Sequence, residues 1–142
     1  MEDILTPVTP EFKLYRDRTI FLGTILGGPA VAGYLMAENF KKFGHPDKAR
    51  LTWIIAIIAT FAIFGAILLI PGSANIPNYA IPILYAVITQ SLVKHFQGQD
   101  IDQHIKNGGP TYSPWRAVWI GIVGLIITLI VIIPFVLFTS TK

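Results

Sequence analysis

The chain has 142 residues, of which 53% are hydrophobic and only 13% are charged. A soluble domain carries about 25% charged residues, so this composition excludes an ordinary soluble protein. The formal net charge of +3 favours basic residues that flank membrane helices and contact lipid headgroups, and it gives no reason to expect nucleic-acid binding.

Four uncharged runs dominate the chain and predict its architecture. Each is close to the ~20 residues that cross ~30 Å of hydrocarbon at 1.5 Å per residue. We expect an all-α membrane protein, a small bundle of four transmembrane helices that form a single integral membrane domain over 1–142. The expected spans are approximately 19–40, 51–70, 76–94 and 115–138, with an amphipathic N-terminal segment over 1–18 and a polar loop over 95–114.

The N-terminal segment opens with two acidic residues and does not resemble a cleaved signal sequence. Within it, Thr9, Pro10 and Glu11 have the order of an N-cap, an N1 proline and an acid in the first helical turn. We therefore expect a short surface helix ahead of the first span.

The first span is loaded with small residues. Pro29 removes a backbone donor and tends to kink a helix, and the Gly23/Gly27 pair forms a G-x-x-x-G pattern that lets another helix approach closely. We predict that the span is kinked, or returns on itself, at Gly27–Gly28–Pro29. The predicted helix-packing residues of this span are Gly23, Gly27, Gly28, Pro29 and Gly33.

The third span is the most polar. Its polar side chains recur at helical spacing on one face, and such a face is costly against lipid, so it should point into the bundle. Hydrogen bonds to neighbouring helices are the favoured interpretation, and a polar path through an oligomer is the alternative. The residues of this path are Asn78, Tyr85, Thr89 and Gln90.

The polar loop predicts a short helix over 100–106. Ile101 and Ile105 would share an apolar face that rests on the membrane surface. One surface cluster in this region carries metal-ligand types, although a solvated helix is the favoured interpretation. Its members are His95, Asp100, Asp102 and His104.

The last span begins with a clear capping pair, Ser113 at the N-cap and Pro114 at N1. Small residues follow at helical spacing and favour close approach of a neighbouring helix. We call them the second seam, and the small residues of the first span the first seam. The predicted packing residues of this span are Ala117, Gly121, Gly124 and Thr128.

The distribution of the eleven cations leaves two topologies open. Four full crossings, the favoured interpretation, place seven cations on one side and four on the other. If the first segment instead dips into the membrane and returns at Gly27–Gly28–Pro29, ten of the eleven share one side, which fits the positive-inside rule better. That alternative requires surrounding protein to satisfy the polar groups of the re-entrant backbone.

Two stretches together resemble a group of short bacterial multi-pass membrane proteins. The first is Gly27–Gly28–Pro29, Gly33–Tyr34–Leu35 and Asn39–Phe40. The second is Gly108–Gly109, Tyr112–Ser113, Trp115–Arg116–Ala117–Val118 and Ile120–Gly121. The resemblance implies a bacterial cytoplasmic (inner) membrane. It implies no catalytic or binding residue, because no activity is assigned to the group.

The expected function is non-enzymatic, because the four spans contain no ionisable group in their centres. No catalytic, metal or cofactor residues are predicted. The two small-residue seams favour an accessory, assembly or stabilising subunit of a membrane complex, with the lipid bilayer and other membrane subunits or further copies as partners. A small oligomeric channel or transporter, using the polar face of the third span, is the alternative.

Overall fold

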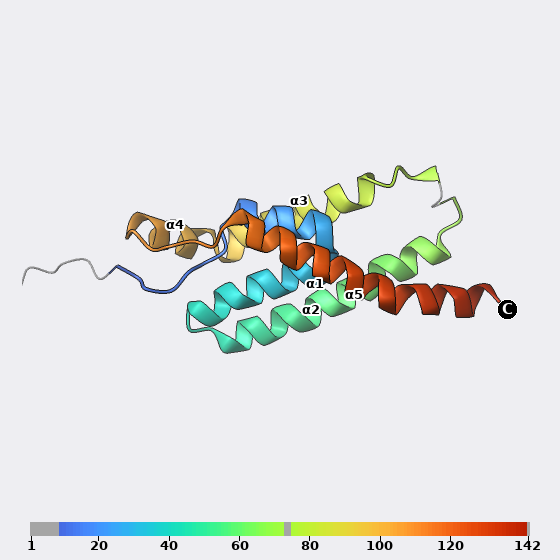
Figure 1. The fold of residues 1–142 in the computed structure, drawn as a ribbon, viewed down its shortest axis with the longest axis horizontal. Helices are drawn as coiled ribbons and strands as arrows, with labels where there is room; N and C mark the ends of the chain where they lie inside the picture. Colours follow the sequence, from blue (N-terminus) through green and yellow to red (C-terminus); the bar gives the residue numbers. More distant parts are fainter. Residues whose placement is uncertain (1–8, 73–74, 142) are drawn as a thin grey trace, which may run out of the picture.

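The computed structural model describes residues 9–72 and 75–141, and within them the fold is entirely α-helical. The helices are α1 (Asp17–Lys42), α2 (Pro46–Leu69), α3 (Ala80–Phe96), α4 (Gly98–Lys106) and α5 (Pro114–Ser140) (Figure 1). By length and composition, α1, α2 and α5 are long and apolar enough to cross a membrane, while α3 is a shorter apolar helix. The all-α prediction is confirmed, and the architecture is compatible with a helical membrane protein.

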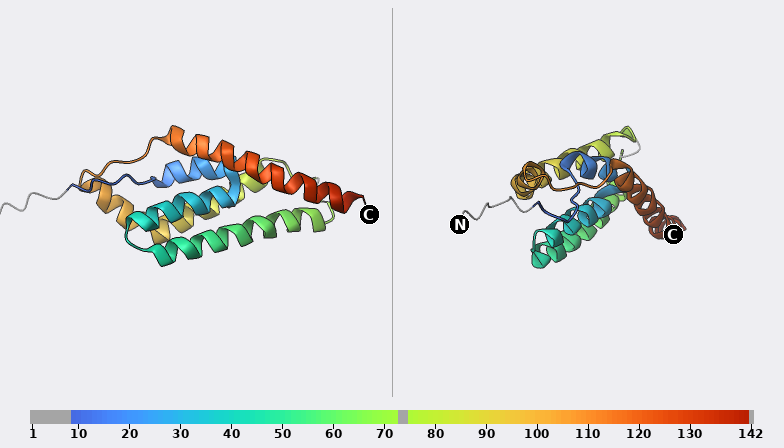
Figure 2. Two further views of the ribbon diagram at one scale, coloured as in Figure 1. Left: turned by 60° about the horizontal axis from the view of Figure 1, so that its bottom comes forward. Right: turned by 60° about the vertical axis from the view of Figure 1, so that its left-hand side comes forward.

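The helix α1 folds back on itself at Gly28, whose backbone has φ 78° and ψ −170°. It therefore forms a helical hairpin with a first arm, 17–27, and a second arm, 29–42 (Figure 2). The backbone N–H of Tyr15 donates to Oδ1 of Asn39 at 2.8 Å, whereas a straight helix would separate residues so far apart in sequence by about 36 Å. Both ends of the hairpin thus lie at the same end of the molecule.

The hairpin changes the count of crossings expected from the sequence. At 1.5 Å per residue the arms are only about 16 and 21 Å long, and neither reaches across ~30 Å of hydrocarbon. Four full crossings are therefore not confirmed. Of the two expectations for this segment, a kink or a return, the structure shows a return of the chain at Gly27–Gly28–Pro29. The outcome follows from the glycine, because the backbone at Gly28 lies in a region that only glycine occupies readily.

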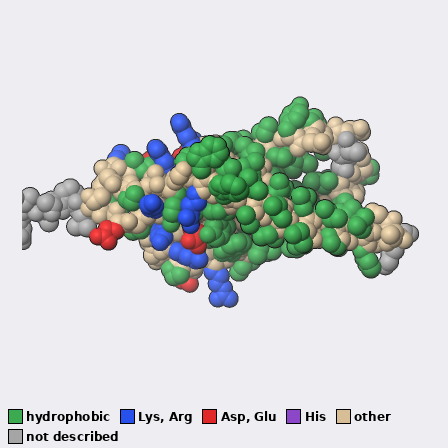
Figure 3. All heavy atoms as spheres, viewed as in Figure 1, with side chains coloured by type: hydrophobic (Ala, Val, Ile, Leu, Met, Phe, Trp, Pro, Cys, Tyr) green, Lys and Arg blue, Asp and Glu red, His purple; other side chains and the backbone are tan. Residues whose placement is uncertain are grey.

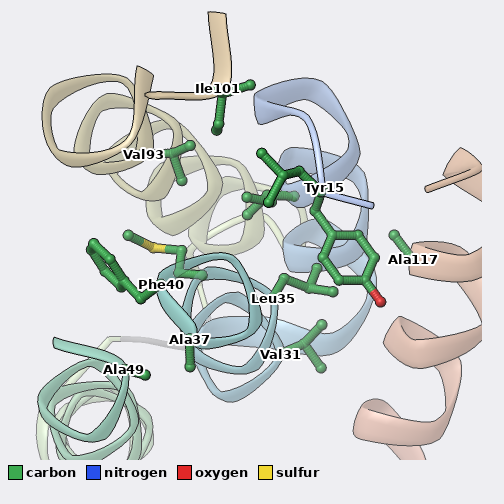
Figure 4. Close-up of a cluster of buried hydrophobic side chains, with 12 residues drawn as sticks. Tyr15, Val31, Leu35, Ala37, Phe40, Ala49, Val93, Ile101 and Ala117 are labelled. Atoms are coloured by element: carbon green, nitrogen blue, oxygen red, sulfur yellow. The ribbon is translucent and has the colours of Figure 1, made fainter. Parts of the chain in front are cut away.

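The hairpin is also the centre of the fold, since α2, α3 and α5 all pack against it and make few contacts with one another. About 61% of the most apolar stretch of α1 is buried, against 6% in α2 and in α5. The buried cluster joins the second arm, which carries Leu35 and Phe40, to Val93 of α3, Ala49 of α2 and Ala117 of α5 (Figure 4). Most of the surface of the outer helices remains apolar and exposed.

Two expected elements differ from the structure. The surface helix expected from Thr9 is wrong, because residues 9–16 are not helical and the first helix begins at Asp17. The backbone of Leu14 is instead paired with the loop before α5, its N–H donating to Pro110 O and its C=O accepting from Tyr112 N. Residues 1–8 of the predicted N-terminal segment lie outside the described residues.

The third span begins later than expected, at Ala80 rather than near 76. Two prolines account for the shift. Pro77 disfavours helical backbone in the residue before it, and Pro82 is tolerated in the first turn of a helix but not in its interior. Starting at Ala80 places Pro82 in that first turn.

The short helix α4 is present, but its apolar face does not rest on a membrane surface. Ile101 is 3% exposed and belongs to the buried cluster. The helix begins directly after α3 (Figure 1), and Ile105, on the same face as Ile101, packs against the buried cluster as well. Together with residues 9–16 and the loop before α5, α4 forms a polar cap on the hairpin.

The charged side chains gather at the capped end of the molecule, and the opposite end is covered by apolar side chains (Figure 3). The sequence explains this partition, because 51–93 and 117–141 contain no Lys, Arg, Asp or Glu. We refer to the two ends as the charged end and the uncharged end.

Candidate functional site

Small residues position the tip of the hairpin against α5. A Cβ added at Gly27 would lie 2.8 Å from the backbone oxygen of Gly121, and one added at Gly23 would lie 3.3 Å from the backbone oxygen of Ala117. A Cβ added at Gly124 would meet the side chain of Val31. The first seam predicted from the sequence thus packs against the second, inside one chain.

The other predicted packing residues have different surroundings. A Cβ on Gly33 would meet Ala56 of α2, so this glycine lets the second arm approach α2. Gly28 forms the reversal itself, and Pro29 opens the second arm directly after it. Thr128 lies beyond the α5 seam, on the wall of a cavity.

That cavity, of about 280 Å³, lies at the tip of the hairpin on the side of the uncharged end. Its floor is the reversal at Gly27–Gly28–Pro29, and α2, α3 and α5 supply its walls. Figure 3 shows the surface hollowed at this end of the molecule. The lining is mostly apolar, with four polar side chains, Thr60, Asn78, Tyr85 and Thr128.

Tyr85 is the polar residue closest to the reversal. Its hydroxyl oxygen lies 4.0 Å from the position that a Cβ on Gly28 would take. The hydroxyl of Thr60 donates to Ala56 O within its own helix at 2.8 Å. A cavity with apolar walls and a few polar groups is the usual form of a small-molecule site, and bundles place such sites between helices.

The structure divides the predicted polar path. Asn78 lines the hairpin-tip cavity, Thr89 lines a neighbouring groove between α2 and α3, and Tyr85 lines both. Gln90 lines neither space. Sequence reasoning did not assign Thr60 to a site, and the only signal for it was that it is one of two threonines, with Thr52, in an otherwise apolar span.

The hairpin closes the bundle toward the charged end with a buried polar network. The side-chain amide of Asn39 accepts from Tyr15 N and donates to Tyr15 O, both at 2.8 Å. It also donates to Gln97 Oε1 at 3.2 Å, and Gln97 in turn donates to Met36 O at 2.8 Å. These bonds hold the two open ends of the hairpin together and attach them to the end of α3.

Replacing Asn39 with leucine is expected to lower the free energy of unfolding by about 3 kcal/mol. The change leaves the backbone groups of Tyr15 and the amide of Gln97 buried without this partner, and each such loss costs about 1–3 kcal/mol. Unfolding in mixed micelles, followed by tryptophan fluorescence, measures the effect. The exposed Asn107 provides the control, and equal losses for Asn39→Leu and Asn107→Leu would contradict the role of the network.

A second set of contacts ties α5 to the hairpin entrance. The guanidinium of Arg116 donates from Nε to the Tyr15 hydroxyl at 2.9 Å and lies 4.6 Å from the ring centre of Tyr112. Burial raises the pKa of the Tyr15 phenol above its usual value of 10.0, although Arg116 acts in the opposite direction. The phenol is therefore neutral at physiological pH.

The predicted surface cluster does not come together as a metal site. In the described part of the chain, no group of three His, Asp or Glu side chains is placed to hold a metal ion. His104 is buried, with Nε2 2.8 Å from Pro110 O and its ring stacked on Phe12. Asp100 and Asp102 are exposed on α4, and His95 packs edge-on against Phe96.

Comparison of the chain with protein-family models, with curated proteins and with solved structures finds no match.

Proposed function

We propose that the protein crosses the membrane three times, through α2, α3 and α5, and that the hairpin is re-entrant from the charged side. The Tyr15–Asn39 contact supports this topology, because it holds the two hairpin ends at one surface. Ten of the eleven cations then share that surface, which the positive-inside rule assigns to the cytoplasm. The bacterial inner membrane is the proposed location.

Within this topology, the hairpin-tip cavity supports a non-enzymatic, ligand-binding function of the transporter class. Its ligand is a small, mainly apolar molecule with one hydrogen-bonding group, and it enters from the side opposite the charged end. The observation that carries this proposal is that Asn78, Tyr85 and Thr60 line one cavity with the non-helical backbone at Gly28, and that the Tyr85 hydroxyl lies beside this backbone. Such backbone is tolerated at membrane depth where protein surrounds it or where it lines a cavity.

An accessory or assembly subunit of a membrane complex is the second candidate. The seams predicted from the sequence no longer support it, because they are occupied within the chain. It is favoured instead by the exposure of α2 and α5, each of which buries only 6% of its most apolar stretch. These faces contact lipid in an isolated protein and other membrane helices in a complex.

A thiol-accessibility experiment tests topology and cavity together, because the native chain contains no cysteine. Single cysteines at Lys13 and His45 are expected to react with a membrane-impermeant reagent from one side of a vesicle, and a single cysteine at Thr141 from the other side. Thr60→Cys and Thr128→Cys are expected to react with a small methanethiosulfonate from the Thr141 side and to be protected from a bulky maleimide.

Ala62→Cys is the matched control for the cavity, since Ala62 is exposed on α2 near Thr60 but does not line the cavity. It should resist both impermeant reagents. Reaction of positions 13 and 45 from opposite sides would contradict the re-entrant hairpin, and reaction of positions 45 and 141 from the same side would contradict three crossings after it. Resistance of positions 60 and 128 from both sides would contradict an accessible cavity while leaving the topology intact.

A further inference from the structure

A second, larger space lies between α2 and α3 and adjoins the proposed ligand cavity, with which it shares Pro29, Ile63 and Tyr85. It is a groove of about 640 Å³. Its floor is the second arm of the hairpin, including Ala32 and Met36. Ile55 and Ala59 of α2 line one wall, and Leu92 of α3 lines the other. The groove exists because α2 and α3 both pack against α1 and hardly contact each other.

The lining of the groove is mainly apolar, with the hydroxyl residues Thr52, Tyr85 and Thr89 among it, and Lys48 lines it at the charged end. The ammonium group of Lys48 lies 6.0 Å from the ring centre of Phe40. Among the described residues the single salt bridge joins Lys41 to Glu38, so Lys48 has no acidic partner in this part of the chain. An unneutralised cation thus lies at the end of a long apolar groove.

We propose that this groove binds a phospholipid with an anionic headgroup, which lies against Lys48 while one acyl chain fills the apolar length. The charged end of the groove matches the headgroup of such a lipid, and its apolar length matches the acyl chain. In the proposed topology Lys48 lies at the cytoplasmic surface, where anionic lipids are concentrated, and each lysine near that surface contributes about 1 kcal/mol of attraction. A hydrocarbon chain suits the remainder, because it has no polar groups to satisfy.

The headgroup half of the proposal is tested with Lys48→Gln. The protein is reconstituted in vesicles of equal phosphatidylglycerol and phosphatidylcholine, extracted in mild detergent, and examined by native mass spectrometry for retained lipid. We expect the native chain to retain phosphatidylglycerol preferentially and Lys48→Gln to reduce this retention about fivefold. Lys42→Gln is the matched control, because Lys42 is exposed at the same end and does not line the groove.

The acyl-chain half is tested with Ala59→Phe, which fills the groove from α2. Ala62→Phe adds the same ring to an exposed position of the same helix that lies outside the groove. Only Ala59→Phe should lower lipid retention, while helix content and thermal midpoint stay close to those of Ala62→Phe. If Ala59→Phe proves to be destabilised, Leu92→Phe takes its place in the test, because it fills the groove from α3.

Three results would overturn the proposal. Equal losses for Lys48→Gln and Lys42→Gln would show general attraction of lipid to the charged end. Unchanged retention in Ala59→Phe and Leu92→Phe would place the acyl chain elsewhere. A native mass that shows a second protein chain, lost on filling the groove, would assign the groove to a transmembrane helix. None of these results bears on thiol access to the hairpin-tip cavity, so the two proposals fail separately.

Discussion

Gly121→Leu is expected to be among the most destabilising substitutions in this protein, with a loss of about 3 kcal/mol in the free energy of unfolding. A Cβ at this position would lie 2.9 Å from Cβ of Leu26 and 3.1 Å from the backbone oxygen of Gly23. Neither neighbour is the free end of a long side chain, so α5 and the hairpin must separate, and overpacking of this kind costs about 1–3 kcal/mol or more. Unfolding in mixed micelles measures the loss.

Gly65→Leu is the matched control, because it makes the same change in α2 at a position with no atom within 4 Å of the added Cβ. Its free energy of unfolding should stay within about 0.5 kcal/mol of the native value. A similar loss for both variants would mean that leucine acts through helix propensity or lipid contact, and the seam between the hairpin and α5 would not be a principal source of stability.

The second large effect is expected for Gly28→Ala, which should open the hairpin. The backbone at Gly28, φ 78° and ψ −170°, lies in a region that is essentially restricted to glycine, and a side chain there costs about 1–3 kcal/mol. Spin labels at Arg18 and Lys42, at the open ends of the two arms, report the change. Their distance should be short in the native chain and should lengthen in the variant toward the ~36 Å of a straight helix.

Gly44→Asn provides the comparison for this prediction. Gly44 also has a positive φ, 79°, but it follows the end of α1, where His45 N donates to Phe40 O and Gly44 N donates to Lys41 O. This is a Schellman arrangement, in which asparagine often replaces glycine. The variant should keep the native spin-label distance, and an unchanged distance in Gly28→Ala would refute the glycine requirement at the reversal.

Much of the helical architecture was predictable from the uncharged runs and from the residues that typically start and end helices. Pro46 and the Ser113–Pro114 pair mark the starts of α2 and α5, and Ser113 Oγ accepts from Trp115 N at 3.3 Å as a capping residue does. The reversal at Gly28 was only one of two readings, because a Gly-Gly-Pro sequence is compatible with a kink as well as a turn. The contact between Tyr15 and Asn39 decides between them. A local sequence pattern cannot predict a contact between two residues so distant in sequence.

The site was predictable in its components but not in its assembly. Small residues at Gly23, Gly27 and Gly121 indicate that another helix approaches closely. They do not indicate which helix, because the same residues suit contact with a helix of the same chain or of another chain. Thr128 continues the helical spacing of the small residues Gly121 and Gly124, although it lines the cavity. Its true surroundings depend on where the hairpin tip ends, which is a property of the whole fold.

The partition of charge between the two ends also bears on how the protein enters a bilayer. In the proposed topology both ends of the hairpin lie on one surface, and the segments carried across the membrane are the loop between α2 and α3 and the residues after α5. The loop over 70–79 contains no charged residue, and the sole cation in the C-terminal segment is Lys142. Because each lysine or acid at the bilayer centre costs roughly 2.5–3.5 kcal/mol on insertion scales, the proposed re-entrant hairpin would spare the chain the transfer of its N-terminal charges.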